Sequence, residues 1–239
     1  MTHPTLEFLP ADDPRLPRRA MWHHSGRAPV KRLVAQRPKR VCGYFVSWKT
    51  GQQVLWQLRL QWDFALLLDT DNEVSRFYAQ TVQVRYDLGN GEQHYTPDYE
   101  VHSFGAARRV FVAVRPDHAG HGEPDFGRLQ ALFAEAGEHL ALVRESAVRA
   151  EPRFGNARLC HPYAREPVAG GVRTAVTEAL RSSGSLPLGD LMHSLGKKEP
   201  NVRPAVLGML CRGELRFDAC QSITDANLVS LPDNGRHPA

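Results

Sequence analysis

Two stretches decide the fold of this chain, HYTPDYEV at residues 94–101 and RVFVAVR at residues 109–115. The second is a nearly continuous apolar run, and such runs are typical of strands buried in the middle of a sheet. The first is the pattern of a strand that is entered through Pro97. Because side chains two residues apart on a strand point to the same face, we expect Asp98 and Glu100 to share one face.

The segments around these two stretches alternate between extended and helical patterns. Further strands are expected at residues 41–47, 74–78, 81–87 and 140–143, and helices at residues 54–68 and 125–139. The first helix is long, rich in leucine and apolar over most of its circumference, so it should be largely buried. This order of elements predicts a mixed α/β domain over residues 41–150.

The C-terminal part of the chain has a different order of elements. Residues 151–170 are rich in Pro, Arg and Gly and are expected to form a linker. Beyond them the pattern predicts three helices and then two strands around a turn, at residues 172–182, 185–195, 200–212, 213–218 and 227–231. Three helices followed by a β-hairpin is the order of a winged helix, so residues 171–232 are expected to form one.

The first forty residues, 1–40, lack periodicity and are expected to form an irregular, basic N-terminal arm. From residue 15 to residue 40 this arm holds many Lys and Arg side chains and no Asp or Glu. A block of one charge sign is typical of a tail or of a contact with a polyanion. A solvated arm without a partner is the alternative. DNA contact is expected at four positions, Arg32, Lys39, Arg40 and Lys49.

Composition excludes several classes of protein. The chain has 239 residues, of which 42% are hydrophobic and 23% charged, so a buried core is expected and disorder is not. No apolar run approaches the ~20 residues of a membrane span, and the N-terminus lacks the order of a signal peptide. The four cysteines form no Cys-x-x-Cys pair. We therefore expect a cytoplasmic protein with reduced thiols and no membrane partner.

A set of short motifs follows the chain in a recognisable order. They are SWKTG, Gln61, DF, DTD, Gln80, YTPDY and FVAVRP, at residues 47–51, 61, 63–64, 69–71, 80, 95–99 and 111–116. In their order and distances these motifs resemble the TnsA family, the endonuclease subunit of heteromeric cut-and-paste transposases. The resemblance covers residues 40–145, and the C-terminal part agrees in the order of its elements.

This resemblance implies both a fold and a set of partners. The fold would be a restriction-endonuclease-like mixed sheet flanked by helices, followed by a winged-helix domain. The partners would be DNA, a transposase subunit of the retroviral-integrase type that makes the other strand cut, and the ATPase regulator of transposition. The family's C-terminal region is thought to engage that regulator. Apolar side chains dominate the third expected helix here, so protein contact is at least as well supported as base reading.

The resemblance also implies a metal site. In such a core a helix glutamate and a strand aspartate hold Mg²⁺, and a lysine on the next strand stabilises the developing charge. In this chain the helix position is Gln61 and the aspartate is Asp98, while the next strand has Ala113 and Arg115. An amide brings no charge, and a guanidinium cannot act as a base. Glu100 is the candidate to replace a lost ligand, so Asp98 and Glu100 are the expected metal ligands.

The leading hypothesis is a TnsA-like subunit of a DNA transposition complex whose nuclease site, Gln61, Asp98 and Arg115, is impaired or inactive. If any activity remains, Mg²⁺ is the expected cofactor. Two alternatives stay open. One is an active Mg²⁺-dependent DNA endonuclease that cuts at transposon ends through Asp98 and Glu100. The other is a winged-helix DNA-binding regulator in which the α/β domain is a scaffold.

Overall fold

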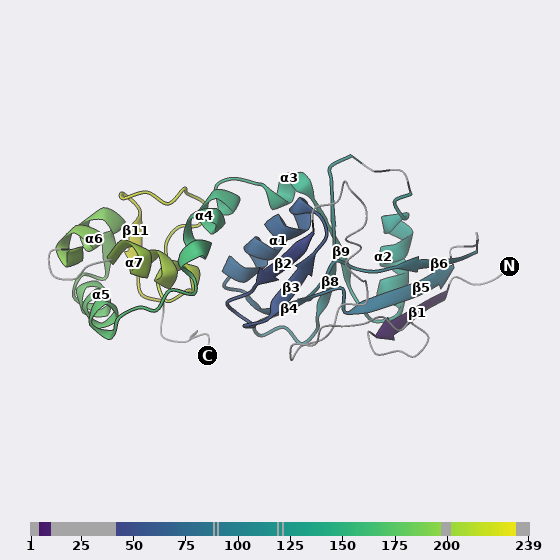
Figure 1. The fold of residues 1–239 in the computed structure, drawn as a ribbon, viewed down its shortest axis with the longest axis horizontal. Coiled ribbons are helices and arrows are strands. Elements are labelled where there is room, and N and C mark those ends of the chain that lie inside the picture. Colours follow the sequence, from purple (N-terminus) through teal and green to yellow (C-terminus); the bar gives the residue numbers. More distant parts are fainter. Residues whose placement is uncertain are drawn as a thin grey trace. The chain divides into compact units, whose positions relative to one another are not determined.

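The computed structural model describes residues 5–10, 42–87, 89, 91–118, 120, 122–196 and 202–232. The chain folds into two compact units (Figure 1). One consists of Met1–Ala65 and Glu73–Val148, and the other of Leu66–Asn72 and Arg149–Ala239. Both helices and strands are present, so the predicted α/β class is confirmed.

A four-stranded mixed sheet forms the centre of the first unit. Its strands are β4 (Val74–Ala79), β7 (Tyr99–Ser103), β8 (Val110–Arg115) and β9 (Leu140–Arg144), in that order across the sheet. The first three are antiparallel neighbours, whereas β9 runs parallel to β8. A parallel neighbour needs a crossover, and α2 (Phe126–Glu135) supplies it. The apolar run that predicted a central strand is therefore β8, with a partner on each side.

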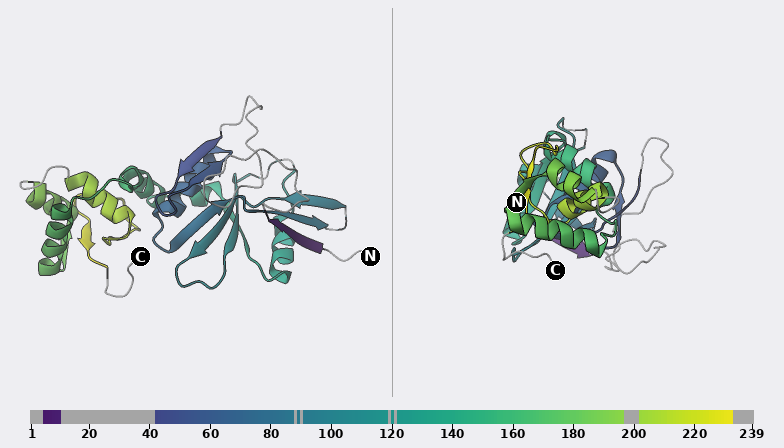
Figure 2. Two further views of the ribbon diagram at one scale, coloured as in Figure 1. Left: turned by 60° about the horizontal axis from the view of Figure 1, so that its bottom comes forward. Right: turned by 90° about the vertical axis from the view of Figure 1, so that its left-hand side faces the viewer.

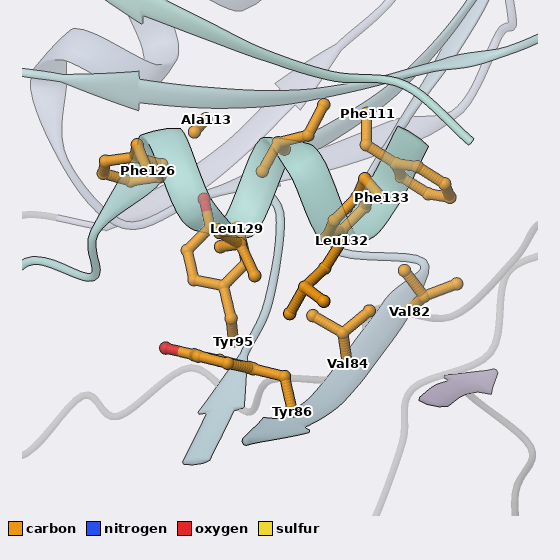
Figure 3. Close-up of a cluster of buried hydrophobic side chains, with 11 residues drawn as sticks. Val82, Val84, Tyr86, Tyr95, Phe111, Ala113, Phe126, Leu129, Leu132 and Phe133 are labelled. Atoms are coloured by element: carbon orange, nitrogen blue, oxygen red, sulfur yellow. The ribbon is translucent and has the colours of Figure 1, made fainter. Parts of the chain in front are cut away.

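Two helices cover opposite faces of this sheet. On one face, Phe64 of α1 (Arg59–Thr70) lies against Tyr99 of β7, with ring centroids 5.7 Å apart. On the other face, Phe111 and Ala113 of β8 pack in a cluster with α2. Figure 3 shows the side chains of α2 in this cluster, among them Leu129, beside Tyr86 and Tyr95 of the neighbouring strands. The period-2 alternation of β7 and β8 thus divides their side chains between two cores.

Two smaller sheets complete the first unit. One consists of β1 (Thr5–Pro10), β5 (Val82–Asp87) and β6 (Glu92–Tyr95), in the order β1-β5-β6 (Figure 2, left). Its apolar side chains join those of α2 in the cluster of Figure 3. The other is the hairpin of β2 (Gly43–Val46) and β3 (Gln53–Trp56), whose turn includes Gly51 at φ 65°. The short helix α3 (Glu145–Val148) ends the unit.

Three expectations for this unit are wrong in part. The helix expected over 54–68 begins only at Arg59, because residues 53–56 pair with β2 instead. The strand expected over 94–101 is two strands in different sheets, with Pro97 in the break between β6 and β7. The N-terminal arm is not irregular throughout, since residues 5–10 form β1. Residues 11–41 lie outside the described residues.

The second unit is mainly helical. Its helices are α4 (Arg153–Cys160), η1 (His161–Tyr163), α5 (Gly170–Ser183), α6 (Leu188–Gly196) and α7 (Val202–Cys211). Strand β10 (Ser185–Pro187) lies between α5 and α6 and pairs with β11 (Leu228–Ser230). The stretch expected to be a linker, 151–170, therefore holds α4 and η1. The strand expected at 213–218 is reduced to a single bridge between Arg216 and Ser230.

Helix α7 is enclosed on nearly all sides. Val202 and every residue from 205 to 211 are buried, although only part of a helix surface is usually buried in a small domain. Besides α6, both α4 and η1 pack against it. At Gly208 an added Cβ would come within 2.6 Å of the Tyr163 carbonyl oxygen, so only glycine allows this approach. The apolar composition of α7 is explained by this packing.

The segment Leu66–Asn72 belongs to the core of the second unit. The buried Asp69 carboxylate lies 2.9 Å from Nε2 of His161, and Asp71 accepts a hydrogen bond of 3.0 Å from Arg153. Gly213, at φ 70°, lies so close to Asn72 that a Cβ there would be 2.8 Å from its side chain. The second unit is therefore built from two separate stretches of the chain.

The described part of the chain can be compared with the expectations about membrane spans and cysteine pairing. Within it, no helix combines the length and the apolar character that crossing a membrane requires. The four cysteines, at positions 42, 160, 211 and 220, are free thiols.

Leu129 tests the core between α2 and the two sheets. Its side chain is fully buried, so Leu129→Ala should lower the free energy of unfolding by about 2–5 kcal/mol through lost burial and a cavity. Glu135→Ala, at an exposed site on the same helix, should change it by no more than about 0.5 kcal/mol. Urea unfolding followed by circular dichroism measures both. A small loss for Leu129→Ala would contradict the described core.

Candidate functional site

Asp98 lies immediately before β7, where the backbone already follows the sheet. Its N–H donates to the Val112 carbonyl at 2.8 Å, and its own carbonyl accepts from the N–H of Gln80 at 3.1 Å. Tyr99 is paired with Val112, so the register places Asp98 across from Ala113. Asp98, Ala113 and Arg115 therefore share one face of the two neighbouring strands.

Both carboxylate oxygens of Asp98 accept hydrogen bonds from protein donors. Oδ1 accepts from Nε2 of Gln61 at 2.6 Å. Oδ2 accepts from the backbone N–H of Val114 at 2.8 Å and from Nη1 of Arg115 at 2.6 Å. The Asp98 side chain is only 7% exposed, so its charge is compensated almost entirely by these partners. The three positions expected from sequence to form one site, Gln61, Asp98 and Arg115, thus converge.

The orientation of the Gln61 amide follows from its two partners. Its Nε2 donates to Asp98, and its Oε1 accepts from the backbone N–H of Gln57 at 2.7 Å. A flipped amide would place oxygen against oxygen and N–H against N–H, so only this assignment satisfies both contacts. The Tyr99 hydroxyl donates to the Gln61 carbonyl at 2.9 Å and ties this turn of α1 to β7. The amide oxygen of Gln61 therefore points away from the carboxylate.

Arg115 is held by several groups besides Asp98. Its Nη1 also donates to the Val114 carbonyl at 2.7 Å, and its Nη2 donates to the Tyr95 hydroxyl at 3.2 Å. The guanidinium lies 5.4 Å from the ring centroid of Phe126 at the start of α2. Burial lowers the pKa of Arg115, but the charge and hydrogen bond of Asp98, with Tyr95 and Glu123, together more than offset this, so that pKa is raised above its usual value. The guanidinium is a permanent cation at this site.

Two tyrosines beside the ion pair remain neutral at ordinary pH. Burial raises the pKa of Tyr95, and the charge of Asp98 raises it further. Burial also raises the pKa of the fully enclosed Tyr99, again with a contribution from Asp98. Their hydroxyls act as neutral hydrogen-bond partners for Arg115 and for the Gln61 carbonyl.

The donor set around Asp98 does not suit Mg²⁺, which prefers several oxygen ligands around one position. Both Asp98 oxygens are occupied, the Gln61 amide presents nitrogen, and Ala113 has no ligand atom. The Arg115 guanidinium already neutralises the carboxylate. Among the described residues, no group of three or more His, Cys, Asp or Glu side chains could hold a metal ion.

Glu100, the expected second metal ligand, has its own set of partners. Its Oε2 accepts from the Thr81 hydroxyl at 2.5 Å, and its Oε1 lies 2.9 Å from Nε2 of His102. Nη1 of Arg109 is 3.6 Å from the same Oε1. Although Glu100 and Asp98 are two residues apart, the described contacts place their carboxylates in different clusters.

Of the four positions expected to contact DNA, only Lys49 lies in the described part of the chain. Its Nζ donates to the Val74 carbonyl at 2.6 Å and lies 5.9 Å from the ring centroid of Trp48. This half-buried ammonium therefore anchors the β2–β3 turn to the start of β4. Arg32, Lys39 and Arg40 lie outside the described residues.

Sequence reasoning missed two kinds of group at this site. One is the backbone N–H of Val114, for which no side chain gives a signal. The other is a residue with a strained backbone, Gln80, whose φ is 52°. Among the described residues, neither the buried Oε1 of Gln80 nor Oγ1 of Thr96 has a hydrogen-bond partner. A left-handed conformation is uncommon for glutamine, and such strain is often found near functional sites. The turn that ends β4 is thus under local constraint.

Replacing Arg115 tests the dependence of Asp98 on its cation. Arg115→Met should lower the free energy of unfolding by about 3–5 kcal/mol, because it leaves a buried carboxylate without its charged partner. Arg153→Met removes a largely exposed partner of Asp71 and should cost no more than about 1 kcal/mol. Urea unfolding measures both. Similar small losses would show that the charge of Arg115 does not stabilise Asp98.

Alkaline pH should act through Tyr95. Its folded-state pKa is raised above the unfolded value of ~10, so its contribution to stability is complete below about pH 10 and is lost as pH rises above it. Tyr95→Phe should therefore show a smaller fall in the urea midpoint between pH 9 and about pH 11.5 than the natural chain. The half-exposed Tyr44 provides the control, Tyr44→Phe, which should fall as the natural chain does. An equal fall for all three would refute this role.

Comparison with models of protein families found no family that matches the chain, and comparison with curated proteins found no match. The function is therefore inferred from the residues described above.

Proposed function

We propose that this chain is a TnsA-like, nuclease-derived subunit of a DNA transposition complex that binds DNA and partner proteins but does not itself cleave DNA. The observation that supports this proposal most directly is the hydrogen bonding of Asp98. Both of its carboxylate oxygens accept hydrogen bonds, from Gln61, Val114 and Arg115. A protein guanidinium takes the place of the metal cation at the position where the nuclease motif would hold Mg²⁺.

The topology of the first unit supports a restriction-endonuclease-like core. Its order α1, β4, β7, β8, α2, β9 gives an antiparallel meander followed by a crossover helix and a parallel strand. In such a core the aspartate begins the second strand of the meander, and the motif with the second carboxylate and the lysine lies on the third. Asp98 precedes β7, while Ala113 and Arg115 occupy β8 at the corresponding places.

The chemistry of the substitutions supports the loss of cleavage. Arg115 keeps the positive charge of a lysine, but a guanidinium does not lose its proton and therefore cannot act as a base. Ala113 lies directly across from Asp98, at the position where a carboxylate would complete a metal site, and it is fully buried. One carboxylate that is already paired with a guanidinium rarely binds a divalent ion in addition. The scaffold is retained, whereas the ligands are not.

The second unit supports protein contact rather than base reading. Its order α5, β10, α6, α7 and β11, with a bridge at Arg216, supports the proposed winged helix. In a DNA-reading winged helix the third helix enters the major groove with exposed polar side chains. Here that helix is α7, which α4 and η1 cover. We therefore assign this unit to contact with other transposition proteins, such as the ATPase regulator or the integrase-type transposase.

Restoring the missing ligands tests the proposal. The natural chain should not nick supercoiled plasmid DNA with Mg²⁺ or Mn²⁺, alone or with an integrase-type transposase. The triple variant Gln61→Glu, Ala113→Glu and Arg115→Lys rebuilds two carboxylates and a lysine beside Asp98 and should acquire metal-dependent nicking. Adding Asp98→Ala to this variant should remove the activity again. Gel electrophoresis of the plasmid measures each step.

A second variant covers the case in which glutamate at the buried position 113 prevents folding. Gln61→Glu with Arg115→Lys leaves Ala113 unchanged and should bind Mn²⁺ more tightly than the natural chain, as measured by calorimetry. Robust nicking by the natural chain that Asp98→Ala abolishes would refute the proposal. So would the absence of any gain in metal binding by a folded double variant.

A further inference from the structure

Arg115 and Arg144 lie side by side at the carboxyl ends of two parallel strands. The register pairs Arg115 of β8 with Arg144 of β9, so both side chains leave the same face of the sheet. Two like charges on directly neighbouring strands repel each other unless anions lie between them. The sequence carried a signal for this pair, because each apolar strand ends in Val-Arg, at Val114-Arg115 and Val143-Arg144.

Glu123 is the anion that contacts Arg144 of this pair. It lies in the loop between β8 and α2, and its Oε2 is 3.4 Å from Nη1 of Arg144. Burial lowers the pKa of Arg115, and the charge of Glu123 helps to raise it, after the larger effects of Asp98 and Tyr95. The side chain of Glu123 is 15% exposed and that of Arg144 is 32% exposed, so this end of the pair faces solvent more than the Asp98 end does.

The two carboxylates differ in how firmly they are held. Asp98 accepts three hydrogen bonds of 2.8 Å or shorter, from Gln61, Val114 and Arg115. Glu123 has one long contact to Arg144, whose same Nη1 donates at 2.9 Å to the Pro116 carbonyl. Asp117, in the same loop as Glu123, accepts from the backbone N–H and the hydroxyl of Ser146. An incoming anion could therefore replace Glu123 far more readily than Asp98.

We propose that Arg115 and Arg144 form a binding site for a phosphate group, which Glu123 occupies in the free protein and leaves when the ligand binds. A tetrahedral phosphate can accept hydrogen bonds from both guanidinium groups, whereas Glu123 makes one long contact. This inference rests on the proposed function in one respect: it assigns the phosphate to the backbone of DNA. Glu123 is then a built-in competitor that weakens binding to unselected anions.

The first test replaces Glu123 by glutamine, which removes the charge and keeps the size of the side chain. The full chain is titrated with inorganic phosphate by calorimetry and with a short fluorescein-labelled DNA duplex by anisotropy, both in EDTA. Glu123→Gln should bind both ligands about tenfold more tightly, since it removes the competing charge. Arg144→Gln should bind both about tenfold more weakly, and should lower the salt dependence of DNA binding by about one phosphate contact.

Matched controls separate the site from general electrostatics. Arg108→Gln removes an exposed cation that lies elsewhere on the first unit and should leave phosphate binding unchanged. The double variant Glu123→Gln with Arg144→Gln should lose the gain of Glu123→Gln alone. Arg144→Lys keeps the charge but not the fork of donors, so it tests the geometry if Arg144→Gln does not fold.

The outcomes are distinct. Gains for Glu123→Gln that require Arg144, with phosphate competing against DNA, would support the proposal. Phosphate binding that depends on Arg144 but does not compete with DNA would overturn the assignment to DNA and leave free phosphate as the ligand. Unchanged affinities in Glu123→Gln would overturn the site itself. Every measurement here is made in EDTA. A failure of the phosphate-site proposal is therefore distinguishable from a failure to restore metal-dependent nicking.

Discussion

The buried ion pair of Asp98 and Arg115 is the constraint on which the arrangement of the first unit depends. A carboxylate at this depth needs compensation, and it draws its donors from α1, from the β8 backbone and from the end of β8. Satisfying one side chain therefore fixes the start of a helix and the alignment of two strands. The two cores on either face of the sheet supply hydrophobic stabilisation. The ion pair determines which residues meet at the end of the sheet where Asp98 and Arg115 lie.

Under the proposed function, the same pair explains how a nuclease-derived scaffold persists without catalysis. A divalent cation and a guanidinium both neutralise carboxylate charge, so either can hold the neighbouring strands together. Only the metal offers open coordination positions to water and phosphate. Replacing one by the other preserves folding and a positive field at the sheet end, while removing the means to activate a nucleophile. Arg115 also stands beside Arg144, which extends that positive field to the next strand.

Sequence reasoning predicted the meeting of Gln61, Asp98 and Arg115 because motif order and strand alternation carry that information. It failed where tertiary pairing outweighed local pattern. Residues 53–56 look helical in a leucine-rich context, yet they pair with β2. The sequence pattern predicts Pro97 as the entry to a single strand, whereas Pro97 separates β6 from β7. Glu100 was expected beside Asp98, but Thr81, His102 and Arg109 surround it. His102, two residues after Glu100 on the same strand, shares its face, but no sequence spacing indicates the contacts with Thr81 and Arg109.

The second unit is built from two separate stretches of the chain, and this affects both how it can be cut and how it can be exchanged between proteins. Residues 66–72 complete its core although they precede it by nearly eighty positions, with Asp69 against His161 and Asn72 against Gly213. A fragment that begins at residue 149 would lack residues 66–72, and its His161 would lose the contact with the buried Asp69 carboxylate. Such a unit cannot be exchanged between proteins as a simple cassette, so recombination that swapped its downstream portion alone would be selected against.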